Sequence, residues 1–342
     1  MPAFKDILGQ EHIKKEMQRA IAENKVSHAY MIAGEELAGK KFVANVIAQT
    51  LLCEHPLQTE MGTEPCGECA SCKKVQLNAH PDLRKVTHEK EGNLSVDEIK
   101  DQLIDDCSLM PFLGNRKVYI IPDAQLMNQA AQNKLLKTLE EPPSYVTIIL
   151  LTTSMESMLT TIRSRCVPFS LRPVEHETLK QYLMQEMGEN AVSAEFAARF
   201  ARGSTGRAVL LVQDAEFAAK ARNMIEMLVN LQSMDIARIT REMKELFGDK
   251  CADVRARDEF FHICLCYFRD ILLFRATENP ENLILRDKEE YISLVARNTS
   301  FYRVVRVNEA MDESKRSIRS NVNAQYVMQF FIMQIRSFIR TA

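Results

Sequence analysis

Short apolar runs alternate with helical patterns through the first half of the chain, and this alternation predicts a parallel sheet with helices on both faces. Ser95 and Glu98 have the spacing of a capping box that opens a helix, because the hydroxyl and the carboxylate can each accept an N–H group left free at the helix start. A further helix is expected over residues 124–140, before Pro142 and Pro143. The runs that we interpret as strands are residues 28–33, 83–87, 117–121, 146–152 and 167–170.

The pattern changes after Arg172 and Pro173, where the strand signals stop and apolar residues recur at helical spacing. The fold class is therefore expected to change from α/β to all-α at this point, and a length of 342 residues agrees with two or three domains. The helices expected in this half are residues 175–186, 193–201, 207–245, 254–277, 288–297 and 321–339.

Composition and charge exclude several classes of protein. Hydrophobic residues make up 46% of the chain and charged residues 26%, as in globular rather than disordered proteins. The apolar stretch at residues 146–151 is far shorter than the roughly 20 residues of a membrane-spanning helix, and the N-terminus lacks the pattern of a secretory signal. We therefore expect a cytoplasmic protein with no membrane partner. A net charge of −2 argues against binding nucleic acid through a bulk positive field, so any contact with DNA is expected to be local or shared.

A phosphate-binding loop follows the first predicted strand. Gly34 and Gly39 allow the tight turn whose N–H groups hold phosphates at a helix N-terminus, and Lys40 stands at the position of the P-loop lysine. The next residue is Lys41, where a P-loop has a Ser or Thr whose hydroxyl binds Mg²⁺. An ammonium group cannot bind a metal ion, so the metal loses one of its two usual protein ligands.

The second motif of such a site is altered as well. The predicted strand 117–121 is followed by Pro122, Asp123 and Ala124, where an active ATPase has a metal-binding Asp and then a catalytic Glu. Either Pro122 takes the metal-ligand position and Asp123 that of the base, or Asp123 is the ligand and Ala124 replaces the base. Both registers lose one group, so no ATP hydrolysis is expected, while ATP binding through the two glycines and the P-loop lysine stays open. A degenerate P-loop taken alone can also be a glycine turn before a helix.

Four cysteines, Cys53, Cys66, Cys69 and Cys72, lie close together in the sequence. Two residues between successive thiols let neighbouring thiolates bind one ion, and a fourth thiolate from an adjacent helix end completes a tetrahedron. The set predicts a structural Zn²⁺ module at about residues 53–72, closed to substrate because all four positions are filled. The alternative is a group of reduced surface cysteines.

A series of motifs resembles the clamp-loader subunits of bacterial DNA polymerase III, in the AAA+ superfamily. The resemblance extends to about residue 207 by motif and beyond it by helical pattern only. The segments that carry it are residues 7–10, 27–30, 34–41, 53–72, 135–142, 164–166 and 203–207.

The resemblance implies three domains: an AAA+ nucleotide fold bearing the zinc module in residues 1–172, a helical lid in residues 173–212, and a helical collar in residues 213–342. It also implies a hetero-pentameric ring with delta and gamma/tau subunits, which contacts the sliding clamp and primer–template DNA as part of a DNA-directed DNA polymerase holoenzyme, a nucleotidyltransferase. The altered metal ligands favour the non-hydrolysing delta-prime branch of the family. The alternative is the ATP-hydrolysing gamma/tau branch.

Two arginines receive roles from the same resemblance. Arg165, between Ser164 and Cys166, matches the arginine that reaches the ATP of a neighbouring subunit in the family. A guanidinium suits this role because it stabilises the charge that spreads over the γ-phosphoryl oxygens. The alternative is a structural arginine paired with a local carboxylate. Arg207 occupies the lid position that senses the chain's own nucleotide in active relatives, and without turnover its role would be structural.

Overall fold

The computed structural model describes residues 2–60, 62–88, 94–320 and 322–339. The chain divides into two compact units, each with its own hydrophobic core. The first comprises Met1–Leu179 with Arg202–Gly206, and the second comprises Lys180–Ala201 with Arg207–Ala342. Residues 173–212 are thus shared between the units, and the division into three domains stays a prediction.

The first unit is built on a parallel sheet of β1 (Ala29–Ala33), β4 (Leu83–Lys85), β5 (Lys117–Ile121), β6 (Val146–Thr152) and β7 (Val167–Ser170). The strand order is β4-β5-β6-β1-β7. All five predicted strands are confirmed, except that β1 begins one residue later than expected and β4 ends at Lys85. The three strands β1, β5 and β6 are buried along their whole length, as central strands covered on both faces should be.

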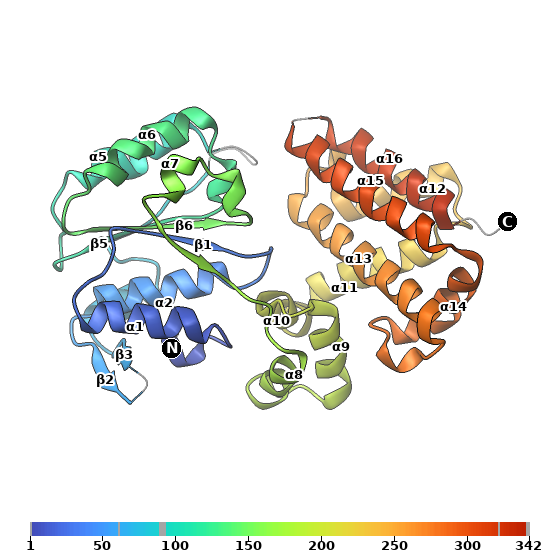
Figure 1. The fold of residues 1–342 in the computed structure, drawn as a ribbon, viewed down its shortest axis with the longest axis horizontal. Coiled ribbons are helices and arrows are strands. Elements are labelled where there is room, and N and C mark those ends of the chain that lie inside the picture. The colour runs from blue at the N-terminus through green and yellow to red at the C-terminus, as the bar shows by residue number, and fades with distance from the viewer. Residues whose placement is uncertain (1, 61, 89–93, 321, 340–342) are drawn as a thin grey trace. The chain divides into compact units, whose positions relative to one another are not determined.

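Helices cover both faces of this sheet, which confirms the α/β class (Figure 1). One face packs on α1 (Glu11–Ala22) and α2 (Lys40–Leu52), and the other on α6 (Gln129–Glu140) and α7 (Thr160–Arg163). Successive strand residues divide between the two cores, since Ile149 lies with the first pair of helices and Ile148 and Leu150 with the second.

Side-chain caps set where helices begin in this unit. The predicted capping box is confirmed at α4 (Val96–Ile99): Ser95 Oγ accepts the Glu98 N–H at 3.2 Å and Glu98 Oε2 accepts the Ser95 N–H at 2.6 Å. The single helix expected over residues 124–140 is divided into a short 3-10 turn and α6. The break arises because Asn128 Oδ1 caps the Ala131 N–H at 2.8 Å and so starts a new helix.

A small hairpin of β2 (Leu57–Thr59) and β3 (Gly62–Glu64) was not predicted. Its strands are short and β2 is exposed, so the sequence carries no alternation of buried and exposed positions there. The buried carboxylate of Glu64 ties the hairpin to the N-terminal segment, because it accepts the Phe4 N–H at 2.7 Å and a Gln18 side-chain N–H at 3.0 Å.

The rest of the chain is helical, as expected. The long helix predicted over residues 207–245 is instead three helices, because Asp214 and Asp235 each cap a new start. The helix predicted over residues 254–277 is confirmed, whereas α15 was missed. The helices are α8 (His176–Gln185), α9 (Ala191–Ala201), α10 (Thr205–Gln213), α11 (Ala215–Asn230), α12 (Ile236–Phe247), α13 (Val254–Thr277), α14 (Glu289–Asn298), α15 (Phe301–Arg319) and α16 (Ala324–Ile339).

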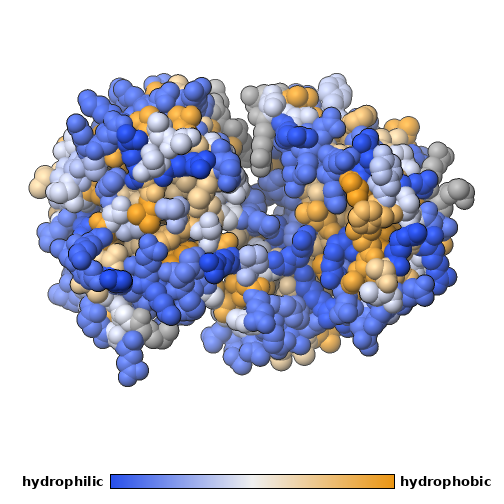
Figure 2. Space-filling view, viewed as in Figure 1, coloured by the Kyte–Doolittle hydropathy of each residue, from blue (hydrophilic) through white to orange (hydrophobic). Residues whose placement is uncertain are grey.

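The face shown in Figure 2 is mainly hydrophilic, with apolar side chains reaching the surface in places. In the second unit the large exposed hydrophobic residues include Phe301 and Tyr302 of α15 and Tyr326 and Phe330 of α16. Among the described residues, no helix is long and apolar enough to span a membrane.

Candidate functional site

The predicted P-loop connects β1 to α2, in the strand, loop and helix arrangement that such a loop requires. Gly39 precedes α2 with φ of 98°, a left-handed conformation that glycine adopts without steric cost. Gly34 leaves room for Leu171, because a Cβ at position 34 would lie 3.0 Å from Leu171 Cβ and that side chain would have to shift. Both glycines thus serve the backbone path of the loop.

Lys40 lies at the start of α2 and is only 6% exposed. Its ammonium group donates to the carbonyl oxygens of Gly34 at 2.7 Å and Glu35 at 2.8 Å. Burial lowers the pKa of Lys40 below its usual value. The lysine expected to bind phosphate therefore bonds to carbonyl groups of its own loop in this structure.

Residues 203–206, which belong to one of the family motifs, contact the P-loop within the first unit. The Gly206 N–H donates to Leu37 O at 2.9 Å, and Thr205 Oγ1 donates to Ala38 O at 3.3 Å. A Cβ on Gly206 would lie 2.4 Å from Leu37 O, so only glycine fits this approach. The contact joins the loop after β1 to the start of α10. It was not predicted because the two segments are far apart in the sequence.

Lys41, at the altered metal-ligand position of the P-loop, lies near Asp123, which follows β5. Lys41 Nζ lies 4.0 Å from Asp123 Oδ2. The contact places a positive charge beside the carboxylate that follows β5, where an active site would hold Mg²⁺ between a hydroxyl and a carboxylate. Asp123 therefore lies beside Lys41, and both registers of the second motif stay predictions.

Arg165 follows α7 and is partly exposed, with 34% of its side chain accessible. Its Nη2 lies 2.8 Å from Glu140 Oε1, and its Nη1 donates to Thr161 O at 2.8 Å and Ser164 Oγ at 3.4 Å. In this structure Arg165, the predicted arginine finger, pairs with a local carboxylate, as the alternative of a structural arginine expects. A third of its side chain is also open to solvent.

Arg207 lies on α10 and is buried with Glu259 of α13, both in the second unit. Its Nε donates to both carboxylate oxygens, at 3.2 and 3.0 Å. Burial raises the pKa of Glu259, and Arg207 opposes this rise. The ion pair gives Arg207 a structural role between two helices, and its role as a nucleotide sensor stays a prediction.

The four predicted cysteine ligands converge, with their Sγ atoms all within 4.8 Å of one another. Cys53 ends α2, Cys66 follows the hairpin, and Cys69 and Cys72 open α3 (Ala70–Gln76). Thiolates bound to Zn²⁺ at about 2.3 Å in a tetrahedron would lie roughly 3.8 Å apart. The Sγ atoms of Cys53 and Cys66 are 3.5 Å apart and those of Cys66 and Cys72 are 4.0 Å apart. The group can therefore hold one metal ion with little rearrangement.

Backbone N–H groups also point at these sulfur atoms. Cys66 N lies 3.3 Å from Cys53 Sγ, Cys69 N lies 3.4 Å from Cys66 Sγ, and Cys72 N lies 3.4 Å from Cys69 Sγ. Burial acts against ionisation of Cys66, but N–H groups of Cys69 and Glu68 outweigh it and lower the pKa of Cys66 to about 7. At Cys66 these donors favour the thiolate, which is the metal-binding form, whereas burial outweighs such donors at Cys53 and Cys72 and raises the pKa of both thiols.

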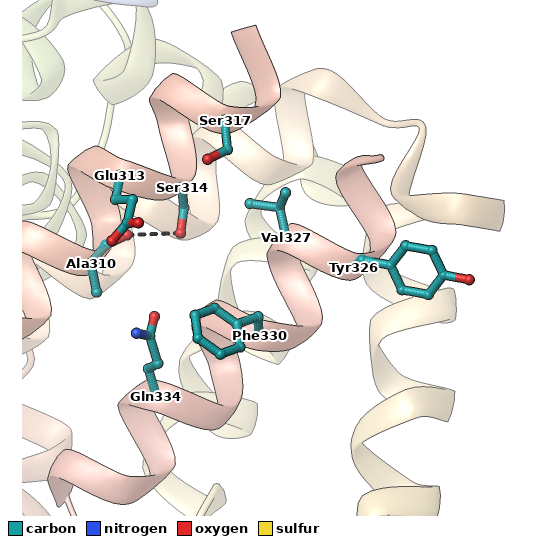
Figure 3. Close-up of a pocket in the computed structure, with 8 residues that line it drawn as sticks. All are labelled: Ala310, Glu313, Ser314, Ser317, Tyr326, Val327, Phe330 and Gln334. Atoms are coloured by element: carbon teal, nitrogen blue, oxygen red, sulfur yellow. Dashed lines mark hydrogen bonds between the residues drawn. The ribbon is translucent and has the colours of Figure 1, made fainter. Parts of the chain in front are cut away.

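A pocket of about 210 Å³ lies between α15 and α16 in the second unit (Figure 3). Val327 and Phe330 of α16 face Ser314 and Glu313 of α15 across it, and Tyr326 lines its edge with the ring directed away from α15. The pocket is separate from the P-loop and from the cysteine cluster, and no sequence motif marked it.

Sequence reasoning also missed the acidic partners of the two arginines, Glu140 and Glu259. A signal existed for Glu140, because Glu140 and Glu141 stand together at the end of a predicted helix. Carboxylates are unfavourable there, next to the negative end of the helix dipole, and a positive partner is expected. Glu259 lies inside α13 and carried no comparable signal.

Comparison with known proteins agrees with this combination of features. Residues 9–175 match the family described as DNA polymerase III, delta subunit. The tau subunit of DNA polymerase III from Bacillus subtilis is 30% identical over 303 residues, which cover 83% of this chain and 52% of that protein. The tau/gamma subunit from Haemophilus influenzae is 31% identical over 245 residues, or 68% of this chain and 35% of that protein.

One relative matches over nearly its full length. The delta' subunit of DNA polymerase III from Bacillus subtilis is 28% identical over 333 residues, which cover 96% of both proteins. By contrast, the chain spans about half of the Bacillus subtilis tau subunit, with 52% covered. The sheet, the P-loop and these matches together show that the chain belongs to the AAA+ family of clamp-loader subunits of bacterial DNA polymerase III.

Proposed function

We propose that this chain is a delta-prime-type clamp-loader subunit that does not hydrolyse ATP and provides Arg165 to the ATP of a neighbouring subunit. The match to a delta' subunit over 96% of both chains supports this assignment. The observation that carries the proposal is the contact between Lys41 and Asp123, 4.0 Å apart. It puts an ammonium group beside the carboxylate on which magnesium-dependent hydrolysis would depend.

An assay of the isolated chain tests the first half of the proposal. Purified chain with Mg²⁺ and ATP is expected to release no phosphate above the rate of a Lys40→Ala variant. Phosphate release that Lys40→Ala abolishes would contradict the proposal. ATP binding without hydrolysis agrees with it, because Gly34, Gly39 and Lys40 are retained.

A reconstituted loader tests the second half. Arg165→Ala is expected to lower the ATPase rate at the one nucleotide site that Arg165 serves by about a thousandfold, since a trans arginine is worth at least that much in other nucleotide hydrolases. The clamp-loading rate of the complex should fall as well. Arg163→Ala is the matched control, because Arg163 is an exposed arginine on the neighbouring helix α7. Wild-type rates in the Arg165→Ala loader would refute the proposed role.

The second candidate is an ATP-hydrolysing gamma/tau-type subunit. The identities of 30% and 31% to tau and tau/gamma proteins favour it. It predicts turnover by the isolated chain that depends on Lys40, so the assay above separates the two candidates.

We further propose that Cys53, Cys66, Cys69 and Cys72 hold Zn²⁺ as a structural ion. A metal ion there would join the end of α2 to the start of α3 and fix the hairpin between them. The proposed partners are delta and gamma/tau subunits in a hetero-pentameric ring, with the sliding clamp and primer–template DNA bound by the whole complex in the cytoplasm. The helices of the second unit, with the exposed pocket between α15 and α16, would supply the collar contacts.

A further inference from the structure

Glu140 is the acidic residue that holds Arg165 in the isolated subunit. It is the last residue of α6, and its Oε1 lies 2.8 Å from Arg165 Nη2. The other terminal nitrogen, Nη1, donates to Thr161 O at 2.8 Å. The guanidinium is therefore fixed between the end of one helix and the backbone of the next.

The position of Glu140 runs against helix electrostatics. Glu140 and Glu141 place two carboxylates at the C-terminal end of α6, where the helix dipole favours cations. Arg165 offsets this unfavourable charge by pairing with Glu140. Departures from local rules are expected at functional or strained sites, and this one involves the residue with the proposed role in trans.

The ion pair is also accessible and weak. The side chain of Arg165 is 34% exposed and that of Glu140 is 48% exposed, so water screens their attraction. A guanidinium binds carboxylate and phosphate through the same planar pattern of N–H donors. A triphosphate group presented by a neighbouring subunit would compete with Glu140 for the donors of Arg165.

We propose that Glu140 is a positioning residue that keeps Arg165 in place in the free subunit and competes for it with the neighbour's triphosphate. This inference rests on the proposed role of Arg165 in trans. When the γ-phosphate replaces the Glu140 carboxylate as the partner of Arg165, the arginine leaves Glu140. Its release is thereby coupled to the arrival of nucleotide at the boundary between the subunits. No covalent step is involved, and the change is one of ion-pair partners.

Loaders reconstituted with a Glu140→Gln subunit provide the test, because glutamine keeps the size of the side chain and removes its charge. The measured quantity is the Arg165-dependent ATPase, obtained by subtracting the rate of the Arg165→Ala loader at each ATP concentration. Glu140→Gln is expected to lower the KM for ATP of this component by roughly two- to five-fold, with little change in kcat, because an exposed ion pair contributes about this factor.

Glu141→Gln is the matched control, since it removes the same charge from the same helix end. It is expected to leave the KM unchanged. The Glu140→Gln, Arg165→Ala double variant is expected to behave as Arg165→Ala alone, because the coupling disappears with the arginine.

Three results would overturn the inference: an unchanged KM with Glu140→Gln, an equal shift with Glu141→Gln, or a fall in kcat at constant KM. The last result would mean that Glu140 aims the arginine in the transition state and does not compete for it. These three results differ from the one that would refute the proposed role of Arg165, because in that case the Arg165→Ala loader itself would retain wild-type activity.

Discussion

Single residues decide how the altered nucleotide site is stabilised. Lys41 pairs with Asp123, and Lys40 donates to two carbonyl groups of its own loop, so both ammonium groups have partners within the chain. Gly206 completes the arrangement by donating its N–H to Leu37 O at 2.9 Å. The P-loop is therefore held by contacts within the first unit in this structure.

Substitution of Gly206 tests this closure. In Gly206→Ala the new Cβ would stand 2.4 Å from a backbone oxygen, which cannot move without shifting the loop. We expect a loss of about 1–3 kcal/mol in the free energy of unfolding of the first unit. Urea unfolding measures it, with Gly114→Ala as the control because a Cβ there meets nothing within 4 Å. Equal stability of the two variants would mean that the loop is not held by this contact.

At the scale of elements, acidic and amide caps fix the boundaries of the helices. Asp214, Asp235 and Asp253 precede α11, α12 and α13, and Asn128 precedes α6. Each side chain accepts N–H groups from the first turn, which the helix cannot satisfy itself. Asp253 has a second partner, Lys220 of α11, at 2.5 Å, so it also joins two helices of the second unit.

The Asp253 cap predicts a dependence of stability on pH. Burial alone would raise the pKa of the Asp253 carboxyl, but Lys220 and the Ala256 N–H hold it below its usual value. A carboxyl whose folded pKa is depressed stabilises the protein fully above its unfolded pKa and loses this effect as the pH falls through the folded pKa. Asp253→Asn keeps the cap but loses the charge, so it should cost about 0.5–1 kcal/mol at neutral pH, a small value because both side chains are partly exposed.

The difference between wild type and Asp253→Asn should begin to shrink below about pH 4, near the unfolded pKa, and close as the pH falls through the lower folded pKa of the carboxyl. Urea unfolding at neutral pH and at about pH 3 measures the two differences. Asp235→Asn is the control, because Asp235 caps α12 and its described contacts include no lysine. A difference that stays constant with pH would contradict the role of the charge.

At the scale of the whole molecule, the cysteine cluster contributes to one unit only. All four cysteines lie in the first unit, and the hairpin between Cys53 and Cys66 is tied to the N-terminal segment through Glu64. The second unit has a separate core of helices α11–α16. Loss of a metal ion from the cluster should therefore loosen the first unit and leave the helical core of the second intact.

Mutation of one ligand tests this separation. Cys69→Ser should remove one equivalent of zinc and lower the Tm of the first unit, because a structural metal site contributes its binding energy to folding. Metal analysis gives the zinc content, and hydrogen exchange shows which helices lose protection. Cys107→Ala, a buried cysteine outside the cluster, should retain the metal. Absence of zinc from freshly purified wild-type protein would contradict the metal assignment.

Prediction from the sequence succeeded where burial produces a long regular pattern. The strands β5 and β6 are buried on both faces and appear in the sequence as continuous apolar runs, so their bounds were found without error. It failed where a single polar residue interrupts a regular pattern, as at Asp214 and Asp235, which divide one expected helix into three. The hairpin was missed because its short strands bury few residues.

The sequence by itself determined the five strands, the altered P-loop, the cysteine set and the arginine after α7, because each depends on residues that are close together along the chain. Only the tertiary structure decided their partners. Arg207 meets Glu259 across 52 residues, and Arg165 and Lys41 each meet a carboxylate from another element. Periodicity reports which face of an element is buried, but the side chain that it meets depends on how elements far apart in the chain pack together.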